Sequence, residues 1–551
     1  MPTDARRHLV TSALPYINGI KHLGNLVGSM LPADVYVRYL RQRGREVLFV
    51  CGTDEHGTPA ELAAAAAGLP VAEFCQRQHE AQRRACAAFD LAFDVFGRSS
   101  SPQNHELTRH LADRLERSGL VEERITSHLY SPDDGRFLPD RYVVGTCPHC
   151  GFEQARGDQC EACSRLLDPT DLRNARSALS GSTRLELRET RHLYLRLPAL
   201  AERVERWLAG HEDWPVLVRS IARKWLREGL RDRSITRDLT WGVPVDRPGF
   251  EEKVFYVWFD APVEYIGATW ELTDAWRDWW YDACDVRHVQ FLGKDNVPFH
   301  TVWWPAVLLG SGEPWKLADY IKGFNWLNYY GGRFSTSRGR GVFMDEALEL
   351  RPADCWRYAL LANAPESDDV EFTWEAFAAC VNGQLADNLG NFAQRVLTLA
   401  TRRPPAPAPW TDLERRLAAD AGAAVDAYTA AMEAIEFRRA ARALEGVWSL
   451  ANRYWSAAQP WRADERRAAA VVAVALNLLR IAAVLGTPWM PRTSGRILDA
   501  LGVPEGGWVD GDSLAAELAA PPGVPRPLGV LFGKVTAEEV EAWKARFGGP
   551  D

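Results

Sequence analysis

Short apolar runs alternate with longer segments of helical spacing along the first part of the chain. Residues 8–13 (His-Leu-Val-Thr-Ser-Ala) and Glu46–Cys51 are short and apolar, which predicts two buried strands. A helix is expected between them, from about Leu23 to Gln42, and residues 59–117 are Ala-rich with a helical pattern. Alternation of strand, helix and strand is typical of an α/β fold built on a parallel sheet.

This alternation stops near residue 118. The segment 118–235 holds several short apolar runs and two close pairs of cysteines, and we expect an inserted domain there. Strand-like runs return at Val254–Phe259 and His288–Leu292. We therefore expect these two runs to form the second half of the same sheet.

The last third of the chain is helical in pattern. Residues 412–455 and 464–485 show the clearest helical periodicity, and the Pro-rich stretch 404–409 predicts a stiff link between helices. Residues 520–551 open with Pro-Pro-Gly-Val-Pro and are expected to end in a short helix at 536–546.

Composition bounds the class of protein. The chain has 551 residues, too many for one compact core, so three or four domains are expected. Its net charge of −8 argues against a protein that coats DNA non-specifically. No apolar run reaches the roughly 18 residues that cross a bilayer, and no signal core follows the N-terminus. We expect a cytoplasmic protein with no membrane partner.

The ten cysteines fall into two groups. Six are scattered, which fits buried thiols in a reducing compartment. The other four form two Cys-x2-Cys pairs nine residues apart, and four thiolates close a tetrahedral structural zinc site. A redox pair is the alternative, but such pairs are seldom doubled. We therefore predict one structural Zn²⁺, bound by Cys147, Cys150, Cys160 and Cys163.

His22-Leu23-Gly24-Asn25 follows a strand and a Pro/Gly loop and opens the first helix. A helix N-terminus offers free N–H groups and a positive dipole end to phosphate. Gly24 would let a nucleotide approach the backbone, and His22 could donate to phosphate oxygens as charge develops. Taken alone, a loop histidine is the alternative interpretation.

A second candidate loop, residues 333–339 (Arg-Phe-Ser-Thr-Ser-Arg-Gly), is rich in hydroxyl and cationic groups. Such a loop can close over a triphosphate, although a solvated turn has the same composition. Together with the first motif, it resembles the pair of nucleotide signatures of class I aminoacyl-tRNA synthetases.

The resemblance extends over nearly the whole chain and is to methionyl-tRNA synthetases, most closely their archaeal and eukaryotic type. Five segments carry it, in the family's order and spacing: 12–16 (Ser-Ala-Leu-Pro-Tyr), 22–25, 51–55 (Cys-Gly-Thr-Asp-Glu), 256–261 (Tyr-Val-Trp-Phe-Asp-Ala) and 293–300 (Gly-Lys-Asp-Asn-Val-Pro-Phe-His).

The resemblance implies a Rossmann-like parallel-sheet catalytic domain split by a zinc-bearing connective insert and followed by an all-α anticodon-binding bundle. We expect the catalytic halves at 1–117 and 236–332, the insert at 118–235, the signature loop and stem-contact segment at 333–384, the bundle at 385–519 and a tail at 520–551.

The family's functional residues map onto this chain one by one. The resemblance implies that Asp54 pairs with the substrate ammonium. It places the methionine side chain among Ala13, Leu14, Tyr16, Trp258, Ala261, Pro262, Tyr265, Asn296 and His300. It assigns nucleotide binding to Gly24, Arg237, Lys294 and Asp295, and catalysis to His22, Asn25, Arg333, Ser335, Thr336 and Arg338.

In the helical part, Asn391 and Arg395 are four residues apart and share a helix face, and Trp461 starts a helix. They match the family's readers of the CAU anticodon, which stack and edge-read unpaired bases. An exposed helix pair with a packed tryptophan is the alternative.

One departure from the family stands out. Its loop reads Lys-Met/Phe-Ser-Lys-Ser, whereas Arg333 and Thr336 replace the two lysines here. Losing one transition-state contact costs roughly 10²–10³ in rate. Arg338 or Arg340 could compensate, because glycines flank them.

Three functions are compatible with these patterns. The first is a methionine–tRNA ligase that uses ATP and Mg²⁺, acts on L-methionine and tRNA(Met), binds no DNA and is a monomer. The second is a paralogue that activates methionine or an analogue for a specialised role with impaired tRNA charging, which Thr336 favours. The third is an inactive tRNA- or methionine-binding regulator, against which Asp54 and His22 argue.

Overall fold

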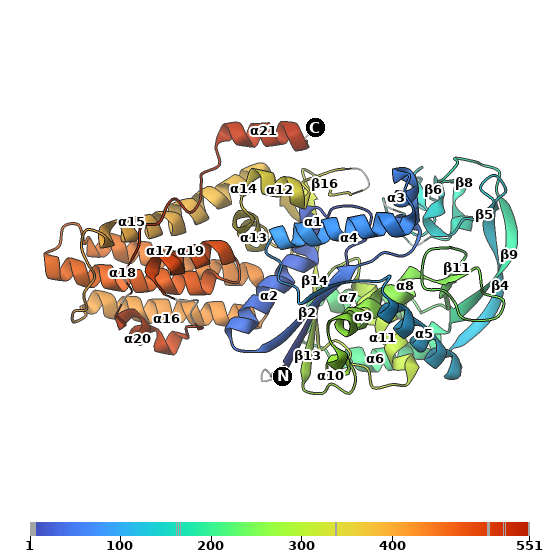
Figure 1. The fold of residues 1–551 in the computed structure, drawn as a ribbon, viewed down its shortest axis with the longest axis horizontal. Helices are drawn as coiled ribbons and strands as arrows, with labels where there is room; N and C mark the ends of the chain where they lie inside the picture. Colours follow the sequence, from blue (N-terminus) through green and yellow to red (C-terminus); the bar gives the residue numbers. More distant parts are fainter. Residues whose placement is uncertain are drawn as a thin grey trace.

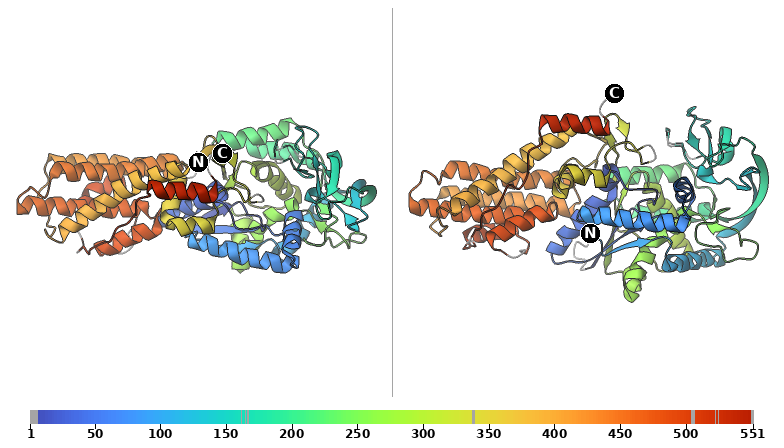
Figure 2. Two further views of the ribbon diagram at one scale, coloured as in Figure 1. Left: turned by 90° about the horizontal axis from the view of Figure 1, so that it is seen from above. Right: turned by 45° about the horizontal axis from the view of Figure 1, so that its top comes forward.

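The computed structural model describes residues 7–160, 162–163, 165, 167–336, 339–503, 507–521, 523 and 525–548. The molecule is elongated, with an α/β part at one end and a bundle of helices at the other (Figure 1). Views from two further directions show the same division (Figure 2).

The α/β part is built on a five-stranded parallel sheet with the strand order β14-β13-β1-β2-β3. β1 lies between β2, which follows it in the chain, and β13, which comes after the insert. The two directions in which the chain leaves this centre make the β1/β13 boundary a topological switch point, where ligands bind in open α/β sheets. The strands are β1 Arg7–Ser12, β2 Glu46–Thr53, β3 Val95–Arg98, β13 Val286–Gly293 and β14 Tyr320–Phe324.

Alternate residues of the sheet face two different cores, as the period of a strand requires. Val10 and Phe49 pack into the cluster that includes α2, whereas Leu9, Leu48 and Val50 pack into the cluster that includes α5, α9 and α11. The layers are therefore helix, sheet, helix. The helices of this part are α1 Leu23–Asn25, η1 Leu26–Met30, α2 Leu31–Gln42, α3 Thr58–Ala67, α4 Val71–Ala88, α5 Pro102–Arg117, α8 Val257–Asp260, η5 Ala261–Val263, α9 Glu264–Leu272, η6 Asp274–Trp276, α10 Arg277–Trp280, η7 Phe299–Trp303 and α11 Trp304–Ser311.

The strand predictions at 8–13, 46–51 and 288–292 are confirmed within two residues, and two others need correction. The helical stretch expected at 59–117 is interrupted by β3, whose four residues are too few for a period to show. The run Val254–Phe259 is a strand only at β12 (Val254–Phe255), and then turns into α8. Short apolar runs do not distinguish a strand from a buried helix.

In its described residues, the region 118–235 forms two sheets, two α-helices and three short 3-10 helices. Its main feature is a long antiparallel ribbon of β4 and β9, flanked by β5 and β10. A separate three-stranded sheet, β7-β6-β8, carries the cysteine pairs near its edge. The elements are β4 Val121–Ser131, β5 Arg136–Phe137, β6 Val143–Thr146, β7 Ala155–Arg156, β8 Arg173–Ser177, β9 Glu186–Leu195, α6 Ala201–Ala209, α7 Val216–Arg227 and β10 Arg233–Ser234.

After β14 the chain forms a small sheet, β16-β15-β17, and then helices that lead into the bundle. The predicted C-terminal helix is confirmed as α21, which returns to pack Trp543 against Trp374 of α14 (Figure 1). The elements are β15 Leu327–Tyr329, β16 Gly332–Arg333, α12 Met344–Leu350, α13 Ala353–Ala362, β17 Val370–Phe372, α14 Trp374–Ala379, η8 Cys380–Gly390 and α21 Ala537–Phe547.

The bundle contains α15 Asn391–Ala400, α16 Asp412–Glu433, α17 Phe437–Ala458, α18 Glu465–Gly486, α19 Pro491–Leu501 and α20 Leu514–Ala519. The helical stretch expected at 412–455 is divided by a turn at Ile435, which has φ +56°.

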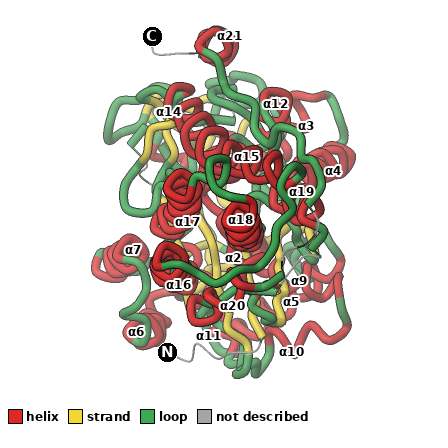
Figure 3. Tube along the Cα trace, turned by 90° about the vertical axis from the view of Figure 1, so that its left-hand side faces the viewer, coloured by secondary structure: helices red, strands yellow, loops and turns green. Residues whose placement is uncertain are grey.

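Our prediction that no run is long and apolar enough to span a membrane is wrong for α18. An 18-residue window of this helix qualifies by length and composition, and 89% of it is buried. Figure 3 shows α18 at the centre of the bundle, surrounded by other helices. A helix that is apolar on all sides serves there as the bundle's core.

Candidate active site

The two nucleotide motifs of the sequence meet in space. His22 is the N-cap of α1, and its Nδ1 accepts a hydrogen bond from the Asn25 N–H at 3.2 Å. Its ring lies 5.1 Å from the ring of Phe334 in the second loop. A second pair of residues also brings the two loops together, because Cγ2 of Thr336 lies 3.5 Å from the position that a Cβ on Gly19 would occupy. The first loop and the second are therefore packed against each other.

Gly24 lies in this packing, with little room for a side chain. A Cβ there would lie 3.1 Å from the His22 ring and 3.5 Å from Phe334. The expected approach of a nucleotide to Gly24 would need Phe334 to move. Two of the first N–H groups of the helix are also in use, because Leu23 N–H donates to the Val342 carbonyl at 3.0 Å and Asn25 N–H to His22. Phosphate binding here would therefore depend more on the His22 side chain than on the N–H groups of the helix.

The imidazole of His22 is neutral at physiological pH. Burial, assisted by the charge of Lys21, lowers its pKa to about 3. Since Nδ1 accepts from Asn25, the proton is on Nε2, which makes that nitrogen the donor. A neutral donor at a helix N-terminus suits an oxyanion that gains charge during reaction.

The predicted strand-end residues gather at the carboxyl edge of the sheet. Tyr16 and Asp54, which follow β1 and β2, form a parallel bridge in which Asp54 N–H donates to the Pro15 carbonyl at 3.0 Å. Lys294 follows β13, and its N–H donates to the Phe324 carbonyl at 2.7 Å. These residues therefore lie at the switch point, where a ligand is expected.

Asp54 is 6% exposed, and among the described residues no group donates to its Oδ1. Burial raises its pKa well above the ordinary value, and the nearby Asp260 carboxylate adds to the shift. A buried acceptor without a partner is costly unless a ligand supplies the donor. An ammonium group would satisfy it.

The sequence did not single out Lys21, which is buried beside this carboxylate. Burial lowers its pKa to about 7, although the charge of Asp54 opposes the shift. Its Nζ donates to Asn18 Oδ1 at 3.0 Å. A lysine adjoining the first motif was the only signal.

Tyr265 and His300 form a neutral polar contact in the predicted methionine pocket. His300 Nδ1 donates to the Asn296 carbonyl at 3.0 Å, and Nε2 accepts from the Tyr265 hydroxyl at 3.0 Å. Burial lowers the pKa of His300 to about 4, so the ring is uncharged. An uncharged, hydrogen-bonded wall is compatible with a thioether ligand.

The other predicted pocket residues differ in their contacts and exposure. Trp258, on α8 rather than on a strand, packs edge-on against Phe299 at 4.3 Å. Tyr16 is 44% exposed and lines a cavity of about 20 Å³ with Tyr256 and Trp258. Ala13 and Pro262 are buried, and Leu14 and Ala261 are partly buried.

The predicted cations are held in different ways. Arg237 donates to Asp140 Oδ2 at 3.0 Å and stacks on Tyr256, with Cζ 3.6 Å from the ring centre. Lys294 donates to Asp369 Oδ1 at 2.5 Å, and Asp295 is exposed. Arg333 stacks on Trp326, with Cζ 3.6 Å from the ring centre.

Of the two arginines expected to compensate for Thr336, Arg338 lies outside the described residues. Arg340 is engaged elsewhere, because it donates to the carbonyls of Tyr329 at 3.0 Å and Tyr330 at 3.3 Å. Its guanidinium also covers Gly332. In this structure, Arg340 fastens the base of the loop, so our suggestion that it swings to the phosphates is not supported.

The four cysteines converge. Their sulfur atoms all lie within 4.8 Å of one another, with 3.9 Å between Cys147 and Cys163 and 3.6 Å between Cys150 and Cys160. Tetrahedral zinc with bonds of about 2.3 Å needs sulfurs about 3.8 Å apart. The residues present therefore fit Zn²⁺.

The three predicted anticodon residues lie in one region of the bundle. Asn391 and Arg395 are on α15, and the Arg395 guanidinium lies 5.8 Å from the ring centre of Trp461. Trp461 is 43% exposed, so part of its ring can meet a base.

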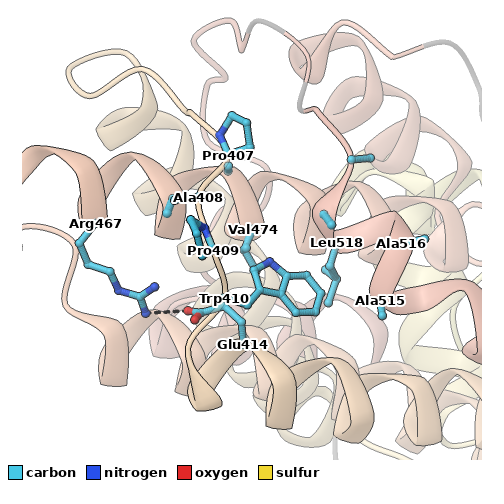
Figure 4. A pocket seen from close by; sticks show the side chains of 14 residues that line it. Pro407, Ala408, Pro409, Trp410, Glu414, Arg467, Val474, Ala515, Ala516 and Leu518 are labelled. Atoms are coloured by element: carbon cyan, nitrogen blue, oxygen red, sulfur yellow. Dashed lines mark hydrogen bonds and ion pairs between the residues drawn. The ribbon is translucent and has the colours of Figure 1, made fainter.

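A larger cavity, of about 610 Å³, lies elsewhere in the bundle (Figure 4). Trp410 extends into it, and the ion pair between Glu414 and Arg467 closes one side. None of the predicted site residues lines it.

Family models match both parts of the chain. Residues 8–397 match class I tRNA synthetases (M), and residues 404–551 match the anticodon binding domain of methionyl tRNA ligase. The methionine–tRNA ligase of Streptomyces avermitilis is 56% identical over 98% of this chain and 99% of its own length. That of Caulobacter sp. strain K31 is 54% identical over 99% of this chain and 100% of its own length.

Solved structures agree. The methionyl-tRNA synthetase of Mycobacterium tuberculosis in complex with methionyl-adenylate superposes with a TM-score of 0.77 and 28% identity, over 96% of this chain and 99% of that one. The apo form of that enzyme gives 0.71 and 25%, over 96% and 98% of the two chains. The full-length likeness, the paired nucleotide loops at the switch point and the anticodon-domain match together show that this chain belongs to the class I methionyl-tRNA synthetases.

Proposed function

We propose that this protein is a methionine–tRNA ligase. It activates L-methionine with ATP to methionyl-adenylate and transfers the methionyl group to the 3′-terminal adenosine of tRNA(Met). The observation that carries this proposal is the full-length identity of 56% to a methionine–tRNA ligase. The similar fold of a synthetase with bound methionyl-adenylate supports the use of ATP.

In the first step, the methionine carboxylate attacks the α-phosphorus of ATP. The bond from that phosphorus to the oxygen bridging the α- and β-phosphates breaks, and pyrophosphate leaves with the electron pair. We assign Asp54 to the substrate ammonium, because it is buried with an unpartnered oxygen. His22 donates through Nε2 to the phosphates, and Lys294 and Arg333 supply positive charge. Mg²⁺, when bound with ATP, would neutralise phosphate charge.

In the second step, a ribose hydroxyl of the terminal adenosine attacks the carbonyl carbon of the adenylate. The bond from that carbon to the phosphate oxygen breaks, AMP leaves with the electron pair, and the hydroxyl proton passes to the phosphate of AMP. Asn391, Arg395 and Trp461 would read the anticodon far from this chemistry, which their clustering on the bundle supports.

We further assign one structural Zn²⁺ to the four cysteines, on the strength of their sulfur spacing. Bound zinc would cross-link the small β7-β6-β8 sheet, which has little core of its own. We retain the domain limits 117/118, 235/236, 332/333, 384/385 and 519/520. The archaeal and eukaryotic-like type also stays a proposal, and the relatives named above are bacterial. We also propose that the protein is a cytoplasmic monomer that binds neither DNA nor membranes.

One observation favours the second candidate, a paralogue with impaired charging. Thr336 faces the Gly19 loop where the family has a lysine, and Arg340 donates hydrogen bonds to backbone carbonyls. We weigh this below the full-length identity, because the pocket and anticodon residues are present.

Two assays separate the candidates. Methionine-dependent exchange of labelled pyrophosphate into ATP reports the first step, and charging of tRNA(Met) transcripts reports both. The proposal requires both activities, and a tRNA with a changed anticodon serves as the control. Exchange without charging would favour the paralogue. The absence of both exchange and charging would refute the enzymatic assignment.

A further inference from the structure

Trp326 lies between the two cations that the proposed reaction places at the nucleotide. It follows β14 and precedes β15, next to the carboxyl edge of the sheet. Its ring centre is 3.8 Å from Nζ of Lys294 and 3.6 Å from Cζ of Arg333. Lys294 comes from the end of β13 and Arg333 from the second loop, so one side chain touches both halves of the phosphate site.

The backbone of Trp326 is fixed by the segment that opens β17. Its N–H donates to Asp369 Oδ1 at 2.9 Å, and its carbonyl accepts from Val370 N–H at 3.0 Å. β15 and β17 then continue side by side, with Leu327 opposite Val370. The backbone that carries the ring is therefore held by hydrogen bonds, although Trp326 lies in a loop between two strands.

The Asp369 carboxylate that holds the Trp326 backbone also binds one of the two cations. Besides the Trp326 N–H, its Oδ1 accepts from Lys294 Nζ at 2.5 Å. Burial alone would raise the pKa of Asp369, but these hydrogen bonds and the charges of Lys294 and Arg333 lower it below the ordinary value. The carboxylate is thus ionised at neutral pH and holds Lys294 against the ring.

Lys294 is held by Asp369 as well as by the Trp326 ring, whereas the side chain of Arg333 is held by the ring. Within the described part of the chain, its guanidinium stacks on this ring and forms no salt bridge, although the carboxylates of Asp295 and Asp369 lie near enough to attract it. A planar guanidinium stacks on an indole better than an ammonium does. Stacking also leaves the N–H donors in the plane of the group available to phosphate oxygens.

We propose that Trp326, held by Asp369, is a positioning residue that sets Lys294 and Arg333 in place for the ATP phosphates during adenylate formation. This inference rests on the proposed function. It also gives the arginine at 333 a physical reason: the position of the loop's first cation is fixed by an aromatic face, which favours Arg over Lys.

The test is pyrophosphate exchange with W326L, W326F, R333A and the two double variants, W326L/R333A and W326F/R333A. A cation–π contact corresponds to about 2- to 30-fold in an equilibrium constant. We expect W326L to reduce kcat/KM for ATP by about 5- to 30-fold while KM for methionine changes less than about 2-fold. W326F keeps a ring and should retain most of the activity.

The cycle with R333A separates positioning from general damage. If Trp326 acts through Arg333, the loss on W326L should shrink by at least about 3-fold once Arg333 is gone. Equal losses in both backgrounds, or a parallel rise in KM for methionine, would overturn the proposal. Should W326L fail to fold, W326M, which also lacks a ring, replaces it in the same cycle and is judged by the same criterion, whereas W326F remains the control that keeps the ring. An inactive wild-type protein would instead refute the proposed function.

Discussion

Asp54 offers the sharpest perturbation of the proposed methionine site. Asp54→Asn keeps the shape and an oxygen acceptor but removes the charge that would meet the substrate ammonium. Breaking a buried ion pair by neutralising one partner costs about 3–5 kcal/mol. Asn retains the acceptor and relieves burial of a carboxylate whose pKa is already raised. We therefore take the lower end, about 3 kcal/mol, or about 150-fold in kcat/KM for methionine.

The pH dependence gives this prediction a second readout. In the free enzyme burial raises the pKa of Asp54, so this carboxyl stays protonated to a higher pH than an exposed one, and its protonated form cannot pair with an ammonium. Methionine affinity of the wild type should therefore increase as pH rises through that pKa, and D54N should lose this dependence. Calorimetric titration of methionine from pH 5.5 to 8, with KM for ATP as the control, checks both effects.

Binding of methionine by D54N within about 5-fold of the wild type, or with the same pH dependence, would refute the pairing of Asp54 with the substrate ammonium. Either outcome would mean that the unpartnered oxygen serves the fold or another ligand and not the substrate ammonium.

Three further perturbations address the second loop, the metal and the anticodon region. Thr336→Lys should raise the exchange rate about tenfold or more by restoring a cation to the phosphates, whereas an unchanged rate would show that another group already fills that role. The protein as isolated should carry one zinc per chain by elemental analysis; Cys147→Ser should lower the zinc content and the melting temperature, and full zinc retention would contradict the four-thiolate site. Trp461→Ala should lower kcat/KM for tRNA(Met) about 5- to 150-fold without altering exchange, with a change of the half-buried Trp410 to Ala as a matched control, and a proportionate loss in exchange would point to misfolding.

Much of this arrangement could be predicted from residue patterns. Buried strands such as β1 and β13 are recognisable from their short apolar runs, because parallel sheets are covered on both faces. The doubled Cys-x2-Cys spacing likewise predicts a close cluster of sulfurs, since so short a chain segment has few other ways to place them.

Contacts between distant residues were not predictable in this way. Nothing in the order of residues indicates that Arg340 turns to the carbonyls of Tyr329 and Tyr330, or that Trp326 faces Lys294. These contacts depend on how β15, β16 and β17 are brought together. The run Val254–Phe259 could form a strand or a buried helix. In the folded protein its second half belongs to α8, because tertiary packing favours the helix there.

The central claim is that a mixed anhydride of methionine and AMP forms at the carboxyl edge of the split sheet. It is tested most directly by incubating the enzyme with labelled ATP, methionine, Mg²⁺ and pyrophosphatase, and counting the label that stays bound after gel filtration. We expect methionyl-adenylate to be retained at about one equivalent per chain, and to be lost when methionine is omitted. An enzyme that binds ATP and methionine but retains no adenylate would contradict the account.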